Sequence, residues 1–438
     1  MMITRRRVLM VAGGLAAAAA APATARADSG SIEAWIAANA AGLDTVDPHA
    51  PLVDLRVLKS NVDGVRLVGL GEPAHNLAEI TTLKHRVLRL LVEQLGFRTV
   101  IWEDDWSLGL LIDDYLCTGE GDLDALVQEM SYGAWRNREV VEVLTWLRGY
   151  NLTHPHNRVH FVGAEHYGTR AFVYDRLSRY IAEIAPELHA EAAGLIQALR
   201  PDPAKPIGEH AWWFFEEAGQ EVQQTYLRRA ARLRALVNRI HRPAGDRDYS
   251  LAYQTARQIE AFYTHYSLDE TEIPSYRDAG SAQTIRWWLA HSGTRTAYWA
   301  AAPHTSRAAE VQLTAPAGTT AYAPVGSHLA RWYGDRYRVI GFAFDHGTYP
   351  TNDGAITLPE PLPEWYERRF HDLTHEQSAL DLRRRGAPGP VRDWLSAPFR
   401  TRGYPEAGEA SSATGGTLAE WYDVVIHRHV VTPVDPYP

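Results

Sequence analysis

Residues 66–105 read RLVGLGEPAHNLAEITTLKHRVLRLLVEQLGFRTVIWEDD, and the fold class follows from them. Two short apolar runs, Arg66–Gly71 and Thr99–Trp102, end in polar or glycine residues and predict buried strands. Between them, apolar residues recur at the spacing of an α-helix and share one face: Ile80, Leu83, Val87, Leu90 and Leu91. This order predicts two parallel strands joined by a helix in a right-handed crossover.

Both ends of the predicted helix carry boundary signals. Asn76 is followed three residues later by Glu79, which predicts a capping pair at the start. Gly96 stands just past the last apolar residue, where a left-handed residue commonly ends a helix.

Further apolar runs downstream predict more buried strands: Arg158–Gly163, Thr296–Ala300, Thr319–Ala323, Tyr337–Phe344 and Asp423–His427. We therefore expect an α/β fold with a mostly parallel central sheet flanked by helices. The stretch Ala407–Gly416 is rich in glycine, alanine and serine and predicts a surface loop.

A long stretch from about 168 to 290 has helical patterning and few strand signals. Its predicted helices are Ala171–Ile184, Leu188–Ala198, Glu216–Ile240 and Tyr249–Tyr266. We expect a large helical insertion over the carboxyl ends of the strands. Its aromatic side chains either line an apolar pocket or pack the helices together: Trp212, Trp213, Phe214, Phe215, Trp287 and Trp288.

The composition indicates a globular protein and gives no basis for a nucleic-acid partner. Of 438 residues, 45% are hydrophobic and 22% charged, and the net charge of −9 comes without a block of five like charges. Cys117 is the only cysteine, so it cannot form an internal disulfide. It is interpreted either as a small buried hydrophobe or as a nucleophile, and the first case is the commoner one.

The N-terminus has the pattern of an export signal. Arg5-Arg6-Arg7 precede an apolar run from Val11 to Ala21, and Ala25-Arg26-Ala27 fits a cleavage site. An arginine pair in this position is typical of twin-arginine export, which carries folded proteins. The run is shorter than the ~20 residues of a membrane span, which disfavours an uncleaved anchor. We expect a signal at 1–27 and a secreted mature domain at 28–438.

Titratable side chains stand at the ends of four predicted strands, in chain order: Glu72 and His75; Glu103 with Asp104 and Asp105; Glu165 and His166; and His304. Because the carboxyl ends of parallel strands meet at one edge of a sheet, we expect these groups to share a crevice. A histidine held by a carboxylate can take a proton from water near neutral pH. A second histidine or a cation can then stabilise the oxyanion formed at an attacked carbonyl.

Two other chemistries are less well supported. There is no G-x-S-x-G elbow for a serine nucleophile, and Cys117 has no promising neighbours in sequence, so covalent acyl transfer is disfavoured. The histidines and carboxylates could hold zinc, but they show neither H-E-x-x-H nor C-x-x-C spacing. We therefore expect direct attack by water and no metal or other cofactor.

The stretch Gly71-Glu72-Pro73-Ala74-His75 is similar to the G-E-x-x-H opening of the erythromycin esterases. Matching segments follow in the family's order over the whole mature chain: Lys84–Leu88, Leu91–Glu93, Gly96–Arg98, Trp102-Glu103, Trp135–Asn137, Trp146–Asn151, Phe161–Glu165, Arg277-Asp278, Gly326–Leu329, Gly341-Phe342 and Tyr422-Asp423. The chain thus resembles enzymes that hydrolyse the lactone of macrolide antibiotics without a metal.

The resemblance implies roles for individual residues. His75 would be the general base, and Glu72 and Glu103 would orient it and the water. Lys84 or Arg86 would fill the family's cationic position on the first helix, the spacing favouring the lysine and the residue type the arginine. The remaining site residues are His304, as the family's second histidine, and Glu165, His166, Trp106, Trp135 and Arg277, which we expect to bind substrate.

The chain also departs from the family pattern close to the expected site. Ala301 and Ala302 stand where the family has histidine and asparagine, Asn76 replaces a usual glycine, and Ser281–Thr284 replaces M-A-x-N. Three functions follow as alternatives: hydrolysis of an ester or lactone in a hydrophobic natural product, biosynthetic acid–base chemistry without water, and non-catalytic binding of an antibiotic. In each case we expect a monomer whose partner is a hydrophobic small molecule, with no membrane contact after signal cleavage.

Overall fold

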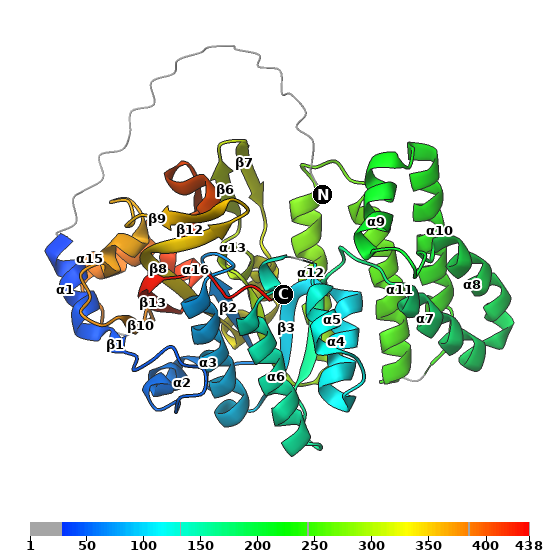
Figure 1. Cartoon of the computed structure of the whole chain (residues 1–438), viewed down its shortest axis with the longest axis horizontal. Helices are drawn as coiled ribbons and strands as arrows, with labels where there is room; N and C mark the ends of the chain where they lie inside the picture. The colour runs from blue at the N-terminus through cyan, green and yellow to red at the C-terminus, as the bar shows by residue number, and fades with distance from the viewer. Residues whose placement is uncertain (1–28, 132, 243–244, 384–385, 438) are drawn as a thin grey trace, which may run out of the picture.

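The computed structural model describes residues 29–131, 133–242, 245–383 and 386–437, which form an α/β fold around a mixed sheet (Figure 1). The predicted export signal at 1–27 lies outside these residues. None of the helices described in these ranges combines the length and the apolar character needed to cross a membrane.

The main sheet has the strand order β1-β10-β13-β8-β2-β5-β3-β4, with β9 beside β8. The bounds are β1 Ala41–Gly42, β2 Leu67–Glu72, β3 Phe97–Asp105, β4 His160–Glu165, β5 Arg295–Ala301, β8 Tyr337–Thr351, β9 Gly354–Leu358, β10 Gln377–Asp381 and β13 Val424–Val431. Neighbouring strands from β13 to β4 run parallel, whereas β1, β9 and β10 pair antiparallel. The predicted parallel strands therefore form the centre of a mixed sheet.

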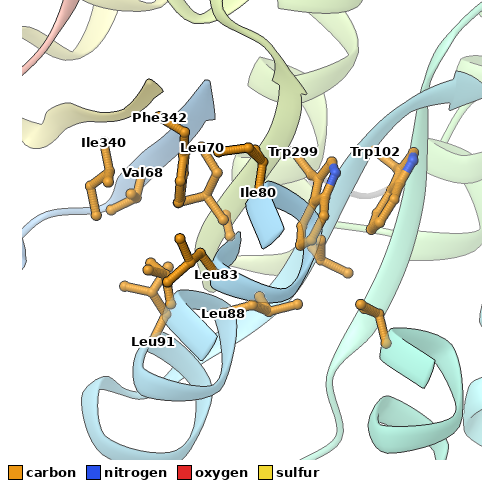
Figure 2. Packing of buried hydrophobic residues seen from close by; sticks show 14 of the residues in the cluster. Val68, Leu70, Ile80, Leu83, Leu88, Leu91, Trp102, Trp299, Ile340 and Phe342 are labelled. Atoms are coloured by element: carbon orange, nitrogen blue, oxygen red, sulfur yellow. The ribbon is translucent and has the colours of Figure 1, made fainter. Parts of the chain in front are cut away.

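Helix α3 (Ala78–Leu95) joins β2 to β3 as predicted. Its apolar face is completely buried and packs under β2, β3, β5 and β8, where Val68, Trp102 and Trp299 meet it (Figure 2). Gly96 follows the helix at φ 71°, the left-handed conformation expected of that position. The predicted capping pair is wrong, because the cap residue is Leu77 and Glu79 instead accepts hydrogen bonds from Thr432.

Alternate residues of the sheet enter two hydrophobic clusters, one on each face. Val68 and Leu70 face the cluster with α3 and α6 (Arg138–Thr153), whereas Leu67 and Tyr298 face the other cluster. The second face is covered by α1 Ser29–Asn39, α12 Ile273–Ser292, α14 Val325–Tyr333 and α15 Gly389–Ser396. The short helices are α2 Lys59–Val62, α5 Leu123–Gln128, α13 Ala302–Thr305 and α16 Leu418–Trp421.

A second, four-stranded antiparallel sheet has the order β11-β12-β6-β7. Its strands are β6 Val311–Ala315, β7 Gly318–Tyr322, β11 Pro398–Arg402 and β12 Ser412–Thr417. The run Thr319–Ala323 was expected as a buried strand, but in β7 it is largely exposed. The loop expected at Ala407–Gly416 is in part β12, since cross-strand hydrogen bonds to β6 order this glycine-rich segment.

The residues between β4 and β5 are helical, with bounds α7 Ala171–Ile184, α8 Pro186–Leu199, α9 Ile207–Trp212, α10 Gln220–Asn238, α11 Arg247–His265 and α12. Most of these helices bury a third hydrophobic cluster of their own and lie beside the β4 edge in Figure 1. Their expected place over the carboxyl ends of the strands is not confirmed. Phe214 and Trp288 are buried and pack against other side chains, whereas Trp212 and Trp213 line one cavity and Trp287 another, so each interpretation describes some of these aromatics.

Candidate active site

Glu72, the last residue of β2, connects two basic side chains. Its Oε1 lies 2.5 Å from Nδ1 of His75, and its Oε2 accepts a hydrogen bond of 2.7 Å from Nζ of Lys84. Glu72 is buried, whereas 22% of the His75 side chain is exposed. The bond at Nδ1 fixes the orientation of the His75 ring and leaves Nε2 as the nitrogen for proton transfer.

Lys84 comes from α3 and is completely buried beneath Glu72. Burial lowers the pKa of Lys84 to about 8, although Glu72 and Glu103 oppose this shift. Its ammonium also lies 4.3 Å from the centre of the Trp299 ring. Of the two residues considered for the cationic position, Lys84 is therefore the one beside Glu72.

Arg86 does not reach the site. Its guanidinium forms two hydrogen bonds of 2.8 Å with Asp54 and donates to the carbonyls of Thr45 and Pro51. Being two residues beyond Lys84 on a helix, it projects from a different face. Its role in the structure is to fix the segment before β2.

Glu103 is buried near the end of β3 among hydrogen-bond donors. Oε1 lies 2.7 Å from Nη2 of Arg277 and 3.4 Å from Nε2 of His304, and Oε2 accepts from the backbone N–H of Ala301 at 2.7 Å. Burial alone would raise the pKa of Glu103, but His304, Arg277 and His75 lower it to about 2. Glu103 is thus ionised at every ordinary pH.

Arg277, on α12, joins the ends of three strands. It contacts Glu103 on β3. In addition, its Nε lies 3.2 Å from Oε2 of Glu165 on β4, and its Nη1 lies 2.9 Å from Nε2 of His304 after β5. The guanidinium also lies 5.2 Å from the centre of the Tyr167 ring. Burial raises the pKa of Glu165 more than Arg277 lowers it.

His304, on α13, has a partner for each ring nitrogen. Nδ1 lies 2.9 Å from Oδ2 of Asp278, and Nε2 faces Arg277. Burial lowers the pKa of His304, but Asp278 and Glu103 together more than reverse this and raise it. Asp278 also accepts from the backbone N–H of Val325 at 2.9 Å, which fixes its carboxylate.

A cavity of about 330 Å³ opens over these groups. Its floor is formed by residues at the carboxyl ends of the parallel strands and by Arg277: Pro73, Ala74, His75, Glu103, Ala301, Ala302, Pro303 and His304. Its wall includes side chains of β6, β8, the second sheet's β11–β12 connection and α16, among them Leu313, Tyr349, Tyr404 and Trp421. An apolar hollow with a few polar groups on one side is the usual form of a small-molecule site.

Comparison with known proteins identifies the family. The family model for erythromycin esterase matches residues 92–431. The chain belongs to the erythromycin esterase family. The match begins after Glu72 and His75, and it includes Glu103, Arg277 and His304.

The sequence relatives are two erythromycin esterases and a putative hydrolase. The chain is 29% identical over 112 residues to erythromycin esterase type II of Escherichia coli, and 31% identical over 117 residues to the putative hydrolase YbfO of Bacillus subtilis. These matches cover 26% of this chain each, and 26% and 25% of those proteins' own length. Erythromycin esterase type I of Escherichia coli is 25% identical over 317 residues, covering 68% of this chain and 74% of that protein.

Solved structures share the fold over nearly the whole chain. A Bacillus cereus protein superposes with a TM-score of 0.82 at 25% identity, covering 94% of this chain and 99% of that one. A succinoglycan biosynthesis protein gives 0.78 at 21% identity, with coverage of 94% and 100%. A mutant of erythromycin esterase EreC in its open conformation gives 0.67 at 17% identity, with coverage of 90% and 98%.

Four of the five residues expected to bind substrate do not line the cavity of this family member: Glu165, His166, Trp106 and Trp135. Glu165 is buried and reaches the site only through its contact with Arg277. His166 is buried against His265 and Tyr276, and burial lowers its pKa well below the ordinary value. Trp106 is buried on α4 (Trp106–Thr118) against Trp287. Trp135 packs 4.4 Å from the His75 ring and donates to the carbonyl of Glu103, so it supports the site from behind.

The two aspartates after Glu103 also have structural partners. Asp105 caps the start of α4 by accepting from the backbone of Ser107 and Leu108, and it pairs with Arg170. Asp104 accepts from the backbone N–H of Ser131, and burial raises its pKa to about 7. Neither side chain lines the cavity.

Sequence reasoning missed several components of the site. Asp278, which orients His304, follows Arg277 directly, and this charged pair within a helical pattern was the available signal. The N–H of Ala301 and the wall residues Tyr349, Tyr404 and Trp421 carried no local signal, because only the tertiary structure brings β5, β8, the β11–β12 connection and α16 to one cavity.

The arrangement has the components of acid–base chemistry on a carbonyl group. His75 is held by a carboxylate and faces the cavity, and Arg277 and His304 form a cationic, hydrogen-bonding region on the same floor. His75 can move a proton to or from water, and the region formed by Arg277 and His304 can stabilise a negatively charged oxygen.

Proposed function

We propose that this protein hydrolyses an ester or lactone in a hydrophobic, macrolide-like natural product, with His75 as the general base. The observation that carries the proposal is the 2.5 Å contact between Glu72 and His75 at the floor of an apolar cavity of about 330 Å³. Family membership supports hydrolysis, and the names of two relatives, erythromycin esterases of types I and II, support the substrate class.

In the proposed reaction, water loses a proton to Nε2 of His75, because Nδ1 is bonded to Glu72. The water oxygen attacks the substrate carbonyl carbon, and the carbonyl oxygen takes up the negative charge. Arg277 and His304 stabilise that oxyanion, while Glu103 holds both of them in position. The tetrahedral intermediate then breaks its C–O bond, and His75 returns the proton to the leaving alkoxide, giving an alcohol and a carboxylic acid.

The test is hydrolysis of a panel of macrolides and other hydrophobic lactones in ¹⁸O-labelled water, followed by mass spectrometry. We expect the mass of the product to exceed that of the lactone by one water molecule, with the ¹⁸O label in the new carboxylate. Replacing the base, His75→Ala, should slow turnover about 10²–10⁴-fold. The matched control is His156→Ala, an exposed histidine outside the cavity, which should leave the rate unchanged.

Hydrolysis that proceeds at the wild-type rate in His75→Ala would overturn the proposed role of His75. A panel that includes macrolides but yields no hydrolysed compound would overturn the proposed substrate class.

A second candidate function is suggested by Ala301 and Ala302, which line the cavity where the family has polar residues. Their methyl groups make this part of the floor apolar and favour acid–base chemistry without water, such as cyclisation or elimination. The same mass spectra separate the candidates: rearranged product carries no label from water, and an antibiotic-binding protein returns its ligand unchanged.

We further propose that catalysis needs no metal and that the protein is exported as a folded monomer. Lys84 and Arg277 already supply positive charge beside the site carboxylates, which supports the first point. As long as the protein stays folded, chelation with EDTA should therefore leave turnover unchanged. The arginine pair at Arg5 and Arg6 supports export, and replacing both by lysine should retain the protein inside the cell.

A further inference from the structure

We propose that Asp113, Cys117 and His160 form a zinc-binding site separate from the candidate active site. Asp113 and Cys117 stand four residues apart on α4, and His160 is the first residue of β4. Among the described residues of the chain, this is the one set of three metal-binding side chains whose ligand atoms lie close enough to share an ion. The proposal does not depend on the proposed function.

The distances between the three ligand atoms match a zinc site. Sγ of Cys117 lies 3.6 Å from Oδ1 of Asp113 and 3.7 Å from Nδ1 of His160, and that nitrogen lies 3.1 Å from the carboxylate. Zinc bonds of about 2.0–2.3 Å in tetrahedral directions place such ligands about 3.3–3.6 Å apart. The side chains therefore need little movement to receive the ion.

The backbone holds the ligands in place before an ion arrives. Gly109 of α4 packs directly on Gly163 of β4, where an added Cβ would lie 2.2 Å from the neighbouring backbone nitrogen. Oδ1 of Asp113 also accepts a hydrogen bond of 2.8 Å from the N–H of Phe161 on the same strand. Such support of a ligand by a second hydrogen bond is common around protein metal sites.

The partial exposure of the cluster agrees with a metal site that has a water as fourth ligand. The side chain of His160 is 39% exposed and that of Asp113 22% exposed, and Cys117 is half-buried, so an ion can enter from solvent. A thiolate and a carboxylate together neutralise the charge of Zn²⁺. Cys117 is thus neither the buried hydrophobe nor the residue without promising neighbours that the sequence indicated.

The same geometry disfavours a cysteine nucleophile. In a nucleophile–histidine–carboxylate triad, the two partners bind opposite nitrogens of the ring, so that the histidine relays a proton. Here Cys117 and Asp113 both face Nδ1 of His160. Three ligand atoms converging on one point suit an ion better than a proton relay.

The site would join α4 to the amino end of β4. Five strand steps of about 3.3 Å separate His160 from Glu165, which places the ion about 16 Å from the carboxyl end where Arg277 binds. Its role is structural: the ion would fix the helix that follows Glu103 against the strand that carries Glu165.

The experiment is a Co²⁺ titration of the full mature protein without a histidine tag, reduced and stripped with EDTA. We expect stoichiometric binding, the near-ultraviolet charge-transfer band of a cobalt–thiolate bond, and the intense visible bands of tetrahedral Co²⁺, all removed by adding Zn²⁺. Because Cys117 is the only cysteine, a charge-transfer band can come from no other residue. Bound Zn²⁺ should also protect this thiol from alkylation.

Three variants test the ligand set, each checked for folding by circular dichroism. Cys117→Ser should lose the charge-transfer band, and Asp113→Asn and His160→Gln should each weaken Co²⁺ binding about tenfold or more. Controls outside the cluster, His75→Ala and His156→Gln, should keep the full spectrum. The proposal is overturned if folded wild-type protein shows no charge-transfer band, or if the band survives His160→Gln with unchanged affinity.

Discussion

Each buried carboxylate of the candidate site is matched by a cation or a hydrogen-bond donor. Glu72 binds His75 and Lys84, and Glu103 binds Arg277 and the N–H of Ala301. This pairing is a physical requirement, since an isolated buried charge costs several kcal/mol. It also fixes the ring of His75, so the network that stabilises the fold orients the proposed base.

We expect Glu103→Gln to destabilise the protein by about 3 kcal/mol at pH 7, because the glutamate's pKa falls from 4.5 to about 2 on folding. A lowered folded-state pKa gives stability that is complete above about pH 4.5 and is lost as pH falls through about 2. The difference between wild type and variant should therefore shrink to about 1 kcal/mol at pH 3. Urea unfolding from pH 7 to pH 3 measures this, and a difference independent of pH would contradict it.

At the scale of elements, two glycines set how closely β4 packs against its neighbours α4 and β3. The Cβ of an alanine at Gly109 would lie 2.2 Å from the nitrogen of Gly163, and one at Gly163 would lie 2.0 Å from the carbonyl oxygen of Asp105. Backbone atoms cannot move aside as a flexible side chain can. The absence of a side chain at Gly109 therefore lets α4 pack closely on β4, and its absence at Gly163 lets β4 pack closely on the end of β3.

Gly109→Ala and Gly163→Ala should each destabilise the protein by about 3 kcal/mol or more, because a new methyl group would overlap backbone. Gly149, on the exposed side of α6, is the matched control, since an added Cβ there meets nothing within 4 Å. Gly149→Ala should stabilise by about 1 kcal/mol through helix propensity. Urea unfolding at pH 7 measures all three, and equal effects would contradict this account of how β4 packs against α4 and β3.

At the scale of the molecule, the described residues bury separate hydrophobic clusters. Two lie on the faces of the main sheet, and the third lies among α7, α8, α10 and α11, with Leu110 packing against both that cluster and the sheet. Elements with their own core and few connections can open without the rest of the protein.

Amide hydrogen exchange should therefore be at least about tenfold faster in α8 and α10 than in α3, which packs in the main cluster. Because all three are helices, secondary structure does not account for the difference. Mass spectrometry of peptic fragments measures it, and the strands β2 and β5 should be protected at least as well as α3. Equal protection of α10 and α3 would show that the molecule opens as one unit.

The amino-acid sequence was enough to predict the central strand–helix–strand unit, the long helices and the family. Apolar residues such as Leu83 and Val68 repeat with the periods of a helix and a strand, and these periods are local properties of the chain. Four residues of the candidate site could also be recognised from the sequence: Glu72, His75, Glu103 and His304. Each lies close after a predicted strand, and the carboxyl ends of parallel strands share one edge of the sheet.

The contacts among these groups, and the side chains that cover them, depend on the three-dimensional fold and were not predictable from the sequence. Lys84 rather than Arg86 meets Glu72 because helix α3 turns its neighbouring residues to different faces. Part of the cavity wall comes from a second sheet, in which β6 pairs with β12 about a hundred residues later in the chain. Asp113, Cys117 and His160 meet where Gly109 packs on Gly163. Contacts between distant segments depend on how side chains pack in three dimensions. The repeat of apolar residues along the chain predicts single helices and strands but not that packing.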